Sequence, residues 1–135
     1  MPPTTSRDFQ KVAAQRLATA QILLKEKLTL DAQYLAGYTV ECSLKALILH
    51  VTPAIDQPDK LRRLTSGAAM HRWEVLLGEL HPHGIFLPVE LAGRIRRFKW
   101  STALRYETKR RDTGETIACL ATAEKVLEWV EEQLP

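Results

Sequence analysis

The segment from Asp31 to Val51 constrains the fold of this chain more than any other. Placed on a helix at 100° per residue, it carries apolar side chains on two broad flanks. The flanks are formed by Val40, Leu44, Leu47 and Val51 on one side and by Leu35, Cys42, Ala46 and Leu49 on the other. A helix that is apolar around most of its circumference lies at the centre of a bundle or at a subunit interface. The narrow remaining face, made of Thr39, Ser43 and His50, is expected to point to solvent.

A stripe of mixed polarity runs between these two flanks. It consists of Tyr34, Tyr38, Glu41, Lys45 and Ile48. Glu41 precedes Lys45 by four residues, which is the favourable order for a helical ion pair. Because apolar and aromatic side chains surround the pair, at least one member requires a further polar partner. We expect Glu41 to pair with Arg105 in a buried polar network that also contains Lys45 and one or more of Tyr34, Tyr38 and Tyr106.

Helical periodicity also describes most of the remaining chain, and no segment alternates with the period of a β-strand. A chain of 135 residues is expected to form one domain, 1–135, with residues 1–6 flexible. The predicted helices are Arg7–Lys27, Asp31 to the residues before Pro53, Ser66 or Gly67 to Leu80, Pro88 or Val89 to about Trp100, and Thr113–Gln133. Residues 53–66 and 101–112 are expected to be loops. The sequence thus predicts an all-α, up-and-down antiparallel bundle of about five helices.

Positive charge is concentrated in the segment from Arg94 to Arg111. Eight Lys or Arg residues and one Glu give this segment a charge of about +7, whereas the whole chain carries +3. Such a segment attracts phosphates or an acidic partner, and interleaved aromatic residues suit base stacking. The candidate binding residues are Arg94, Arg97, Lys99, Arg105, Tyr106 and Lys109. The alternative interpretation is that Phe98 and Trp100 belong to the core and that the basic residues form a solvated face.

Several kinds of chemistry find no support in the sequence. The one close pair of histidines, His81 and His83, lies in a predicted loop without a nearby carboxylate or cysteine pattern, so no metal site is expected. There is no phosphate-binding glycine loop, dinucleotide fingerprint or nucleophile elbow, so no cofactor is expected. Cys42 and Cys119 are expected to be buried free thiols. No apolar run is long enough for a membrane span and no signal peptide is evident, so a cytoplasmic location is expected.

The chain resembles the HEPN domain family. The resemblance covers most of the chain from about Arg16 and is carried by DAQYLAGYTVECSLKALI, MHRWEVLL, KWSTALRYE and ETIACLATAEKVLEWVEEQL. It implies a compact antiparallel helical bundle, often a homodimer with a polar cleft along the shared interface. Many members look like components of toxin–antitoxin, phage-defence or RNA-processing systems, often beside a small nucleotidyltransferase. Active members are metal-independent ribonucleases that use an Arg-x(4–6)-His motif; here no arginine is followed by a histidine at that spacing, and Arg105-Tyr106-Glu107 stands in the expected region.

Three functional hypotheses follow from these observations. The first is a non-cleaving HEPN-like module that binds RNA, a nucleotide or a partner protein, such as a nucleotidyltransferase, through the basic segment. The second is a metal-independent ribonuclease of altered motif, for which Arg105, Tyr106 and Glu41 are weak catalytic candidates. The third is a purely structural dimerisation module. In all three, the apolar circumference of Asp31–Val51 predicts a homodimer built mainly from the second and last helices.

Overall fold

The structure is a computed structural model that describes residues 2–98 and 100–134, and within these residues the regular elements are helical. The α-helices are α1 (Ser6–Lys25), α2 (Thr29–Val51), α3 (Gln57–Leu64), α4 (Trp73–Leu80), α5 (Val89–Ile95) and α6 (Thr113–Gln133). Short 3-10 turns cover Ala54–Asp56, Ala68–His71, His81–His83 and Thr102–Tyr106. The predicted all-α bundle is confirmed. None of the helices among the described residues is long and apolar enough to cross a membrane.

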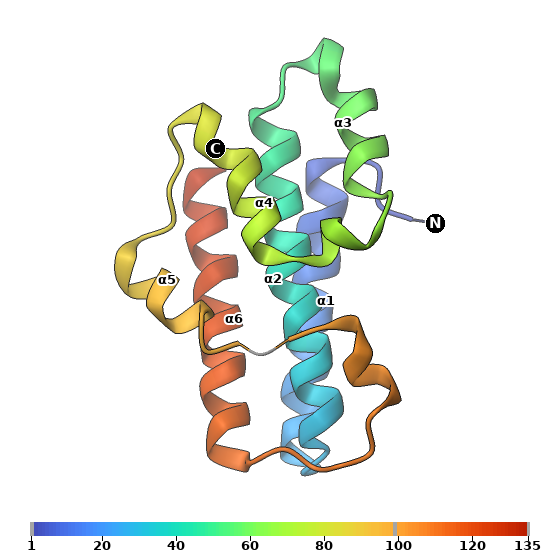
Figure 1. Ribbon diagram of the computed structural model, residues 1–135, viewed down its shortest axis with the longest axis vertical. Helices are drawn as coiled ribbons and strands as arrows, with labels where there is room; N and C mark the ends of the chain where they lie inside the picture. Colours follow the sequence, from blue (N-terminus) through green and yellow to red (C-terminus); the bar gives the residue numbers. More distant parts are fainter. Residues whose placement is uncertain (1, 99, 135) are drawn as a thin grey trace.

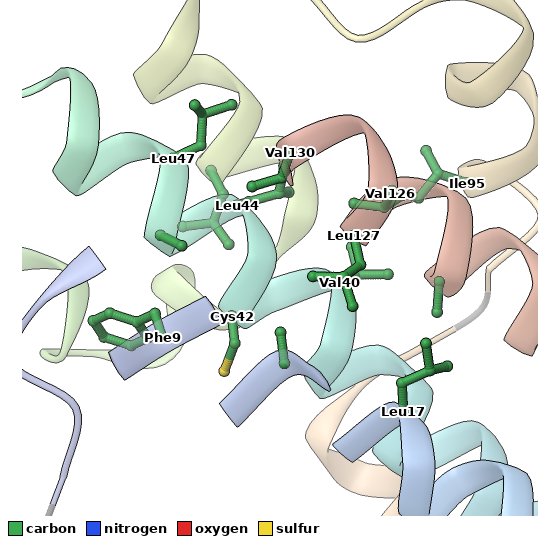
Figure 2. Close-up of a cluster of buried hydrophobic side chains, with 14 of the residues drawn as sticks. Phe9, Leu17, Val40, Cys42, Leu44, Leu47, Ile95, Val126, Leu127 and Val130 are labelled. Atoms are coloured by element: carbon green, nitrogen blue, oxygen red, sulfur yellow. The ribbon is translucent and has the colours of Figure 1, made fainter. Parts of the chain in front are cut away.

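Helix α2 lies at the centre of the bundle. Helices α1, α4 and α6 and the turn Thr102–Tyr106 pack around it, and Figure 1 shows α2 beside α1 and α6 with α4 crossing near its C-terminal half. Figure 2 shows side chains of α1, α2, α5 and α6 in one core, including Val40 and Leu44 of α2 near Val126 and Val130 of α6. Every residue of α2 from Thr39 to Leu49 is buried. The apolar circumference of α2 is therefore covered within a single chain.

The predicted solvent face of α2 is wrong at two of its three positions. Thr39 and Ser43 are fully buried because α1 covers this face of α2. The Thr39 hydroxyl donates to the carbonyl oxygen of Ala13 in α1 at 3.1 Å, and the Ser43 hydroxyl donates to the Thr39 carbonyl at 2.6 Å. Small hydroxyl residues that satisfy their own polar atoms in this way let two helices approach closely. His50 is exposed, as predicted.

The predicted helix boundaries fail mainly between Pro53 and Trp100. Residues 53–66 contain helix α3 rather than a loop, with Pro58 in its first turn. The helix predicted from Ser66 or Gly67 begins only at Trp73, because Gly67 has a φ of 85° and the residues after it form a 3-10 turn. Helix α5 ends at Ile95 rather than near Trp100. The second and last helices lie close to their predicted bounds because both have long, uninterrupted helical periodicity.

Hydrogen-bonded caps fix where α1 and α6 begin. The Thr5 hydroxyl accepts from the Asp8 backbone N–H at 3.1 Å. The Thr4 backbone N–H donates to the Asp8 carboxylate, and this bond contributes most to lowering the pKa of Asp8. The Ser6 hydroxyl donates to the Ala46 carbonyl at 2.7 Å, which ties the start of α1 to α2. At the start of α6 the Asp112 carboxylate accepts from the Glu115 N–H at 2.8 Å. This last cap determines where the irregular segment before α6 ends.

Candidate functional site

The segment that joins α5 to α6 folds back onto the N-terminal half of α2. Figure 1 shows its part after Trp100 passing across α2 and returning below the bundle to the start of α6. Trp100 lies directly against Gly37, where a Cβ atom would be 2.0 Å from the indole Nε1. The indole N–H donates to the Tyr34 carbonyl oxygen at 2.8 Å. Gly37 is thus required for close approach of the indole to the helix backbone, and Trp100 anchors the segment on α2.

Three aromatic residues form a contiguous cluster at this anchor. The Trp100 ring stacks on Tyr34 at a centroid distance of 6.2 Å and meets the edge of Tyr38 at 5.1 Å. The Tyr34 and Tyr38 hydroxyl oxygens lie 3.1 Å apart and share a hydrogen bond. Burial, followed by this hydrogen bond, raises the pKa of Tyr38 above its ordinary value. All three rings are half-buried. Phe98 packs against the hydrophobic core, whereas Trp100 packs on the surface of α2.

A cavity of about 440 Å³ lies behind the anchored segment. It is bounded by α2, α5, α6 and four residues between α5 and α6, namely Arg97, Phe98, Trp100 and Leu104. The residues that line it are Gln33, Arg94, Arg97, Phe98, Trp100, Leu104, Glu115, Ala118, Cys119, Ala121 and Thr122. Most of this lining is apolar or aromatic, and the charged groups are two guanidinium groups and one carboxylate. Concave sites for small ligands have this combination of apolar walls with a few polar groups.

The charged residues of the cavity wall are accessible to solvent. Arg97 and Glu115 are exposed, and the Arg94 side chain is 39% exposed. The Arg94 guanidinium lies 3.9 Å from the Glu90 carboxylate, which is at the outer limit of an ion pair. Two arginines that face one apolar hollow are suited to hold an anionic group, because a guanidinium offers several N–H donors in one plane.

Two polar residues of the cavity wall are buried, and the first is Gln33, which is 7% exposed. Its side-chain amide Nε2 donates to the Thr116 hydroxyl oxygen at 2.9 Å, and the Thr116 hydroxyl donates to the Asp112 carbonyl at 2.7 Å. Thr122, which is 5% exposed, donates its hydroxyl to the Ala118 carbonyl at 2.9 Å. These bonds connect the interior of the cavity to the first turns of α6.

A second polar cluster lies farther along α2, where a buried ion pair meets a partly exposed histidine. Lys45 Nζ contacts Glu41 Oε2 at 2.9 Å, and His71 Nδ1 contacts Glu41 Oε1 at 2.9 Å. Glu41 and Lys45 are 5% and 4% exposed, whereas the His71 side chain is 39% exposed. Both carboxylate oxygens thus have a partner from an element that is fixed in the fold. The cluster joins α2 to the 3-10 turn Ala68–His71.

The prediction that Glu41 pairs with Arg105 is wrong. Arg105 is exposed on the turn Thr102–Tyr106, and its guanidinium carbon lies 5.0 Å from the centroid of the Tyr106 ring. The adjacent phenol of Tyr106 raises the pKa of Arg105 above its ordinary value. Lys45 is itself buried beside Glu41. His71 is the second partner of the Glu41 carboxylate, so the carboxylate does not require an arginine. Tyr38 lies next to this cluster, at a centroid distance of 6.5 Å from the His71 ring.

The predicted binding residues divide into separate groups in space. Arg94 and Arg97 line the cavity. Arg105 and Tyr106 are exposed on the turn that follows Trp100, and Tyr106 is 78% exposed. Lys109 lies with Arg110 and Arg111 around a different hollow beside the start of α6. Lys99 lies outside the described residues. The described basic residues thus line two hollows that share Glu115, and only Arg94 and Arg97 among the predicted binding residues line the cavity.

Sequence reasoning missed several residues of these sites. His71 contacts Glu41 from 30 residues away, a distance in sequence that no local pattern reveals. Gln33 could have been recognised as a candidate site residue, because it places a side-chain amide within the apolar circumference of α2. Cys119 was expected to be buried, but it is half-buried and lines the cavity. Cys42 is buried, and both thiols are free, as predicted.

The ionisable groups do not form a metal centre in the described part of the chain. Within residues 2–98 and 100–134, no three His, Cys, Asp or Glu side chains are close enough together to hold a metal ion. His81, one of the two clustered histidines in the sequence, instead stacks on Phe86 at a centroid distance of 4.8 Å.

Comparisons with known proteins give one finding. Residues 6–133 match the HEPN domain, so the match covers α1 through α6 and both polar sites. No curated protein and no solved structure shows significant similarity to the chain.

Proposed function

The chain belongs to the HEPN domain family, and from this premise we propose that it is a non-cleaving module that binds a nucleotide, either free or as an exposed nucleotide of an RNA. The binding site in this proposal is the cavity bounded by α2, α5, α6 and the residues Arg97, Phe98, Trp100 and Leu104. The observation that carries the proposal is the placement of Arg94 and Arg97 on the wall of a cavity that is otherwise mainly apolar.

The size and lining of the cavity support a nucleotide as ligand. A volume of about 440 Å³ is in the range of small-molecule sites, which is roughly 300–1,000 Å³. A nucleobase is flat and largely apolar on its faces, so it suits a space lined by Phe98, Trp100 and Leu104. The phosphate group then contacts Arg94 and Arg97, whose guanidinium groups match its oxygen atoms.

The absence of a cleavage motif supports binding without cleavage. No arginine of the chain is followed by a histidine at the spacing that the active members of the family use. The acid–base candidate Glu41 is buried and engaged by Lys45 and His71, whereas Arg105 is exposed on a separate turn. A binding role requires neither group to change its protonation state.

The experiment is a titration of the purified protein with fluorescent AMP and with a short single-stranded RNA at several salt concentrations. We expect binding that weakens as salt rises, because phosphate contacts release counterions. Replacing Arg97 by Ala should weaken binding about tenfold, as expected for loss of a charge-assisted hydrogen bond. Arg16→Ala is the matched control, since Arg16 is exposed on α1 and does not line the cavity. Equal binding by both variants would contradict the proposal.

A second candidate function is metal-independent RNA cleavage, and the contact between Glu41 and His71 favours it. A carboxylate that accepts from Nδ1–H orients an imidazole and leaves Nε2 as a proton acceptor, and the His71 side chain is 39% exposed. Incubation of RNA with the protein in chelator distinguishes the two candidates. The proposed function predicts intact RNA for both the unmodified protein and the His71→Ala variant, whereas cleavage that His71→Ala abolishes would establish the second candidate.

Association with other protein chains remains a prediction. The homodimer was expected to use α2 and α6. Residues Thr39 to Leu49 of α2 are buried within the chain, so such a contact would use the other residues of α2 and the exposed face of α6. A nucleotidyltransferase partner is implied only by the family resemblance. Light scattering at tens of micromolar protein tests the homodimer, since a monomeric mass at that concentration would contradict it.

A further inference from the structure

The orientation of the Gln33 side-chain amide is fixed by its neighbours. The Thr116 hydroxyl donates its single hydrogen to the Asp112 carbonyl, so towards Gln33 this hydroxyl can only accept. The amide nitrogen of Gln33, rather than its oxygen, must therefore face Thr116. Asp112 is the N-cap of α6, so the chain of bonds is anchored at a helix terminus.

This arrangement leaves the amide oxygen of Gln33, Oε1, without a partner from Thr116. Within residues 2–98 and 100–134, the bond to Thr116 is the one hydrogen bond of the Gln33 side chain, and no fully enclosed side-chain N or O atom lacks a partner. The amide oxygen Oε1 is therefore reachable from the cavity that Gln33 lines. The residue as a whole is 93% buried, since 7% of it is exposed, so a ligand in the cavity is the natural partner of this oxygen.

A second interior group has the same hydrogen-bonding character. The Thr122 hydroxyl donates to the Ala118 carbonyl, so its remaining capacity towards the cavity is as an acceptor. The donors of the cavity wall, Arg94 and Arg97, are more exposed than these two residues. The buried part of the wall thus offers two acceptors and the second N–H of Gln33 Nε2, and the accessible part offers positive charge. A matching ligand places N–H donors inside and an anionic group outside.

We propose that Gln33 selects the base of the bound nucleotide by its exocyclic amino group, which donates to Gln33 Oε1 and which adenine provides. This inference rests on the proposed function, because it names the ligand class of the same cavity. A glutamine amide matches the adjacent donor and acceptor atoms on the edge of adenine. Uracil presents a carbonyl oxygen where adenine carries the amino group, so it leaves Oε1 facing another acceptor.

The test compares two nucleotides that differ only in the amino group, AMP and purine riboside 5′-monophosphate, by calorimetric titration. We expect the unmodified protein to bind AMP about tenfold more tightly, the effect of one buried hydrogen bond. Gln33→Met, which keeps the length of the side chain, should bind AMP about tenfold more weakly and should bind the two nucleotides equally. Gln15→Met makes the same change at an exposed position of α1 and should behave as the unmodified protein.

The outcomes separate this inference from the proposed function. If neither nucleotide binds at millimolar concentration, the proposed function fails and the inference fails with it. If both bind equally to the unmodified protein, the nucleotide site stands and adenine selection is overturned. If AMP remains preferred by a folded Gln33→Met variant, Gln33 is not the selecting residue. The comparison within the unmodified protein needs no variant, so it remains decisive even if Gln33→Met does not fold.

Discussion

Helix α2 carries two buried polar sites that differ in whether their hydrogen bonds are complete. Towards its C-terminal half, Glu41 has both carboxylate oxygens engaged, by Lys45 and by His71. Towards its N-terminal half, Gln33 lines a cavity, and its amide nitrogen bonds within the fold, which leaves its amide oxygen for a ligand in our proposal. A complete site stabilises the structure and offers little to a ligand, whereas an incomplete site lowers the cost of binding a matching group. Substitution at the complete site is therefore expected to lower the stability of the fold, whereas substitution at the incomplete site is expected to lower ligand affinity.

The largest expected effect is at the complete site. Glu41→Gln should lower the free energy of unfolding by about 3–5 kcal/mol, because it leaves the buried charge of Lys45 uncompensated. Lys45→Met should cost less, because Glu41 keeps its contact with His71. The double variant should be less destabilised than the sum of the single variants, since it buries no charge. Thermal and urea unfolding of the three proteins give the coupling free energy. Strictly additive losses would show that the two side chains do not interact in solution.

The second effect is at the boundary of the two sites, where Trp100 lies on Gly37. Gly37→Ala places a methyl group 2.0 Å from the indole nitrogen, so the ring must leave α2 and lose its bond to the Tyr34 carbonyl. We expect a loss of about 1–3 kcal/mol in unfolding free energy, as for other overpacked sites. The cavity loses the Trp100 wall at the same time, so nucleotide affinity should also fall. Tryptophan fluorescence reports the displacement of the ring.

A matched substitution controls for the intrinsic effect of replacing glycine by alanine in a helix. Gly78→Ala lies in α4, where the added Cβ meets no atom within 4 Å. This variant should be equally or more stable than the unmodified protein, because alanine favours a helix by about 1 kcal/mol over glycine. Equal effects of the two substitutions would mean that Trp100 does not lie on Gly37 in solution.

The contrast between the two sites also explains what sequence could predict. The periodicity of Asp31–Val51 placed α2 at the centre, and the position of Glu41 and Lys45 in an apolar helix showed that their charges are buried. Their partner could not be predicted, because the contact with His71 depends on how a 3-10 turn folds back over 30 residues. The expected partner, Arg105, was chosen for its chemistry, but the segment that carries it is anchored through Trp100 and leaves Arg105 exposed.

The predicted binding residues illustrate the same limit. A run of basic residues in sequence indicates a total charge, but it does not indicate which side chains share a surface. Helix α5 places Arg94 at the cavity, and the following residues bring Arg97 to the same wall, whereas Lys109 faces a separate hollow after the chain has turned. Gln33 and Arg94 line the same cavity because α2 and α5 both border it. The two residues are far apart in the sequence, so the sequence does not reveal that they share a site.

A third prediction concerns the stability of the incomplete site. Arg97→Ala should change the free energy of unfolding by no more than about 0.5 kcal/mol, because Arg97 is an exposed residue of the cavity wall. The same variant is expected to bind nucleotide more weakly. Urea unfolding without and with AMP measures both effects, since a bound ligand stabilises the folded state. A loss of several kcal/mol without ligand would instead place Arg97 among the residues that hold the fold together.

The smallest effect on stability at neutral pH involves the two free cysteines, one near each site. Burial raises the pKa of Cys42 and of Cys119 from an ordinary value of 9.0 to about 12. The folded protein thus keeps both thiol protons at a pH where the unfolded chain has lost them. This contribution to stability is complete below pH 9 and is lost as the pH rises towards about 12, because the unfolded state then binds fewer protons.

The raised pKa makes both thiols slow to react, and the position of Cys119 at the cavity makes the two reaction rates different. At pH 8 a thiol with a pKa of about 12 is thiolate in about one molecule in ten thousand, against about one in ten for an ordinary thiol with a pKa of 9.0. Alkylation by iodoacetamide, followed by mass spectrometry, should therefore be slow and should accelerate about tenfold per pH unit between pH 7 and 9.

Cys119 should react before Cys42, because Cys119 lines the cavity and Cys42 is 7% exposed. AMP should slow the reaction of Cys119 alone, which distinguishes occupation of the cavity from a general stabilisation of the fold. Equal protection of both cysteines by AMP would indicate that the nucleotide binds elsewhere and acts by suppressing unfolding.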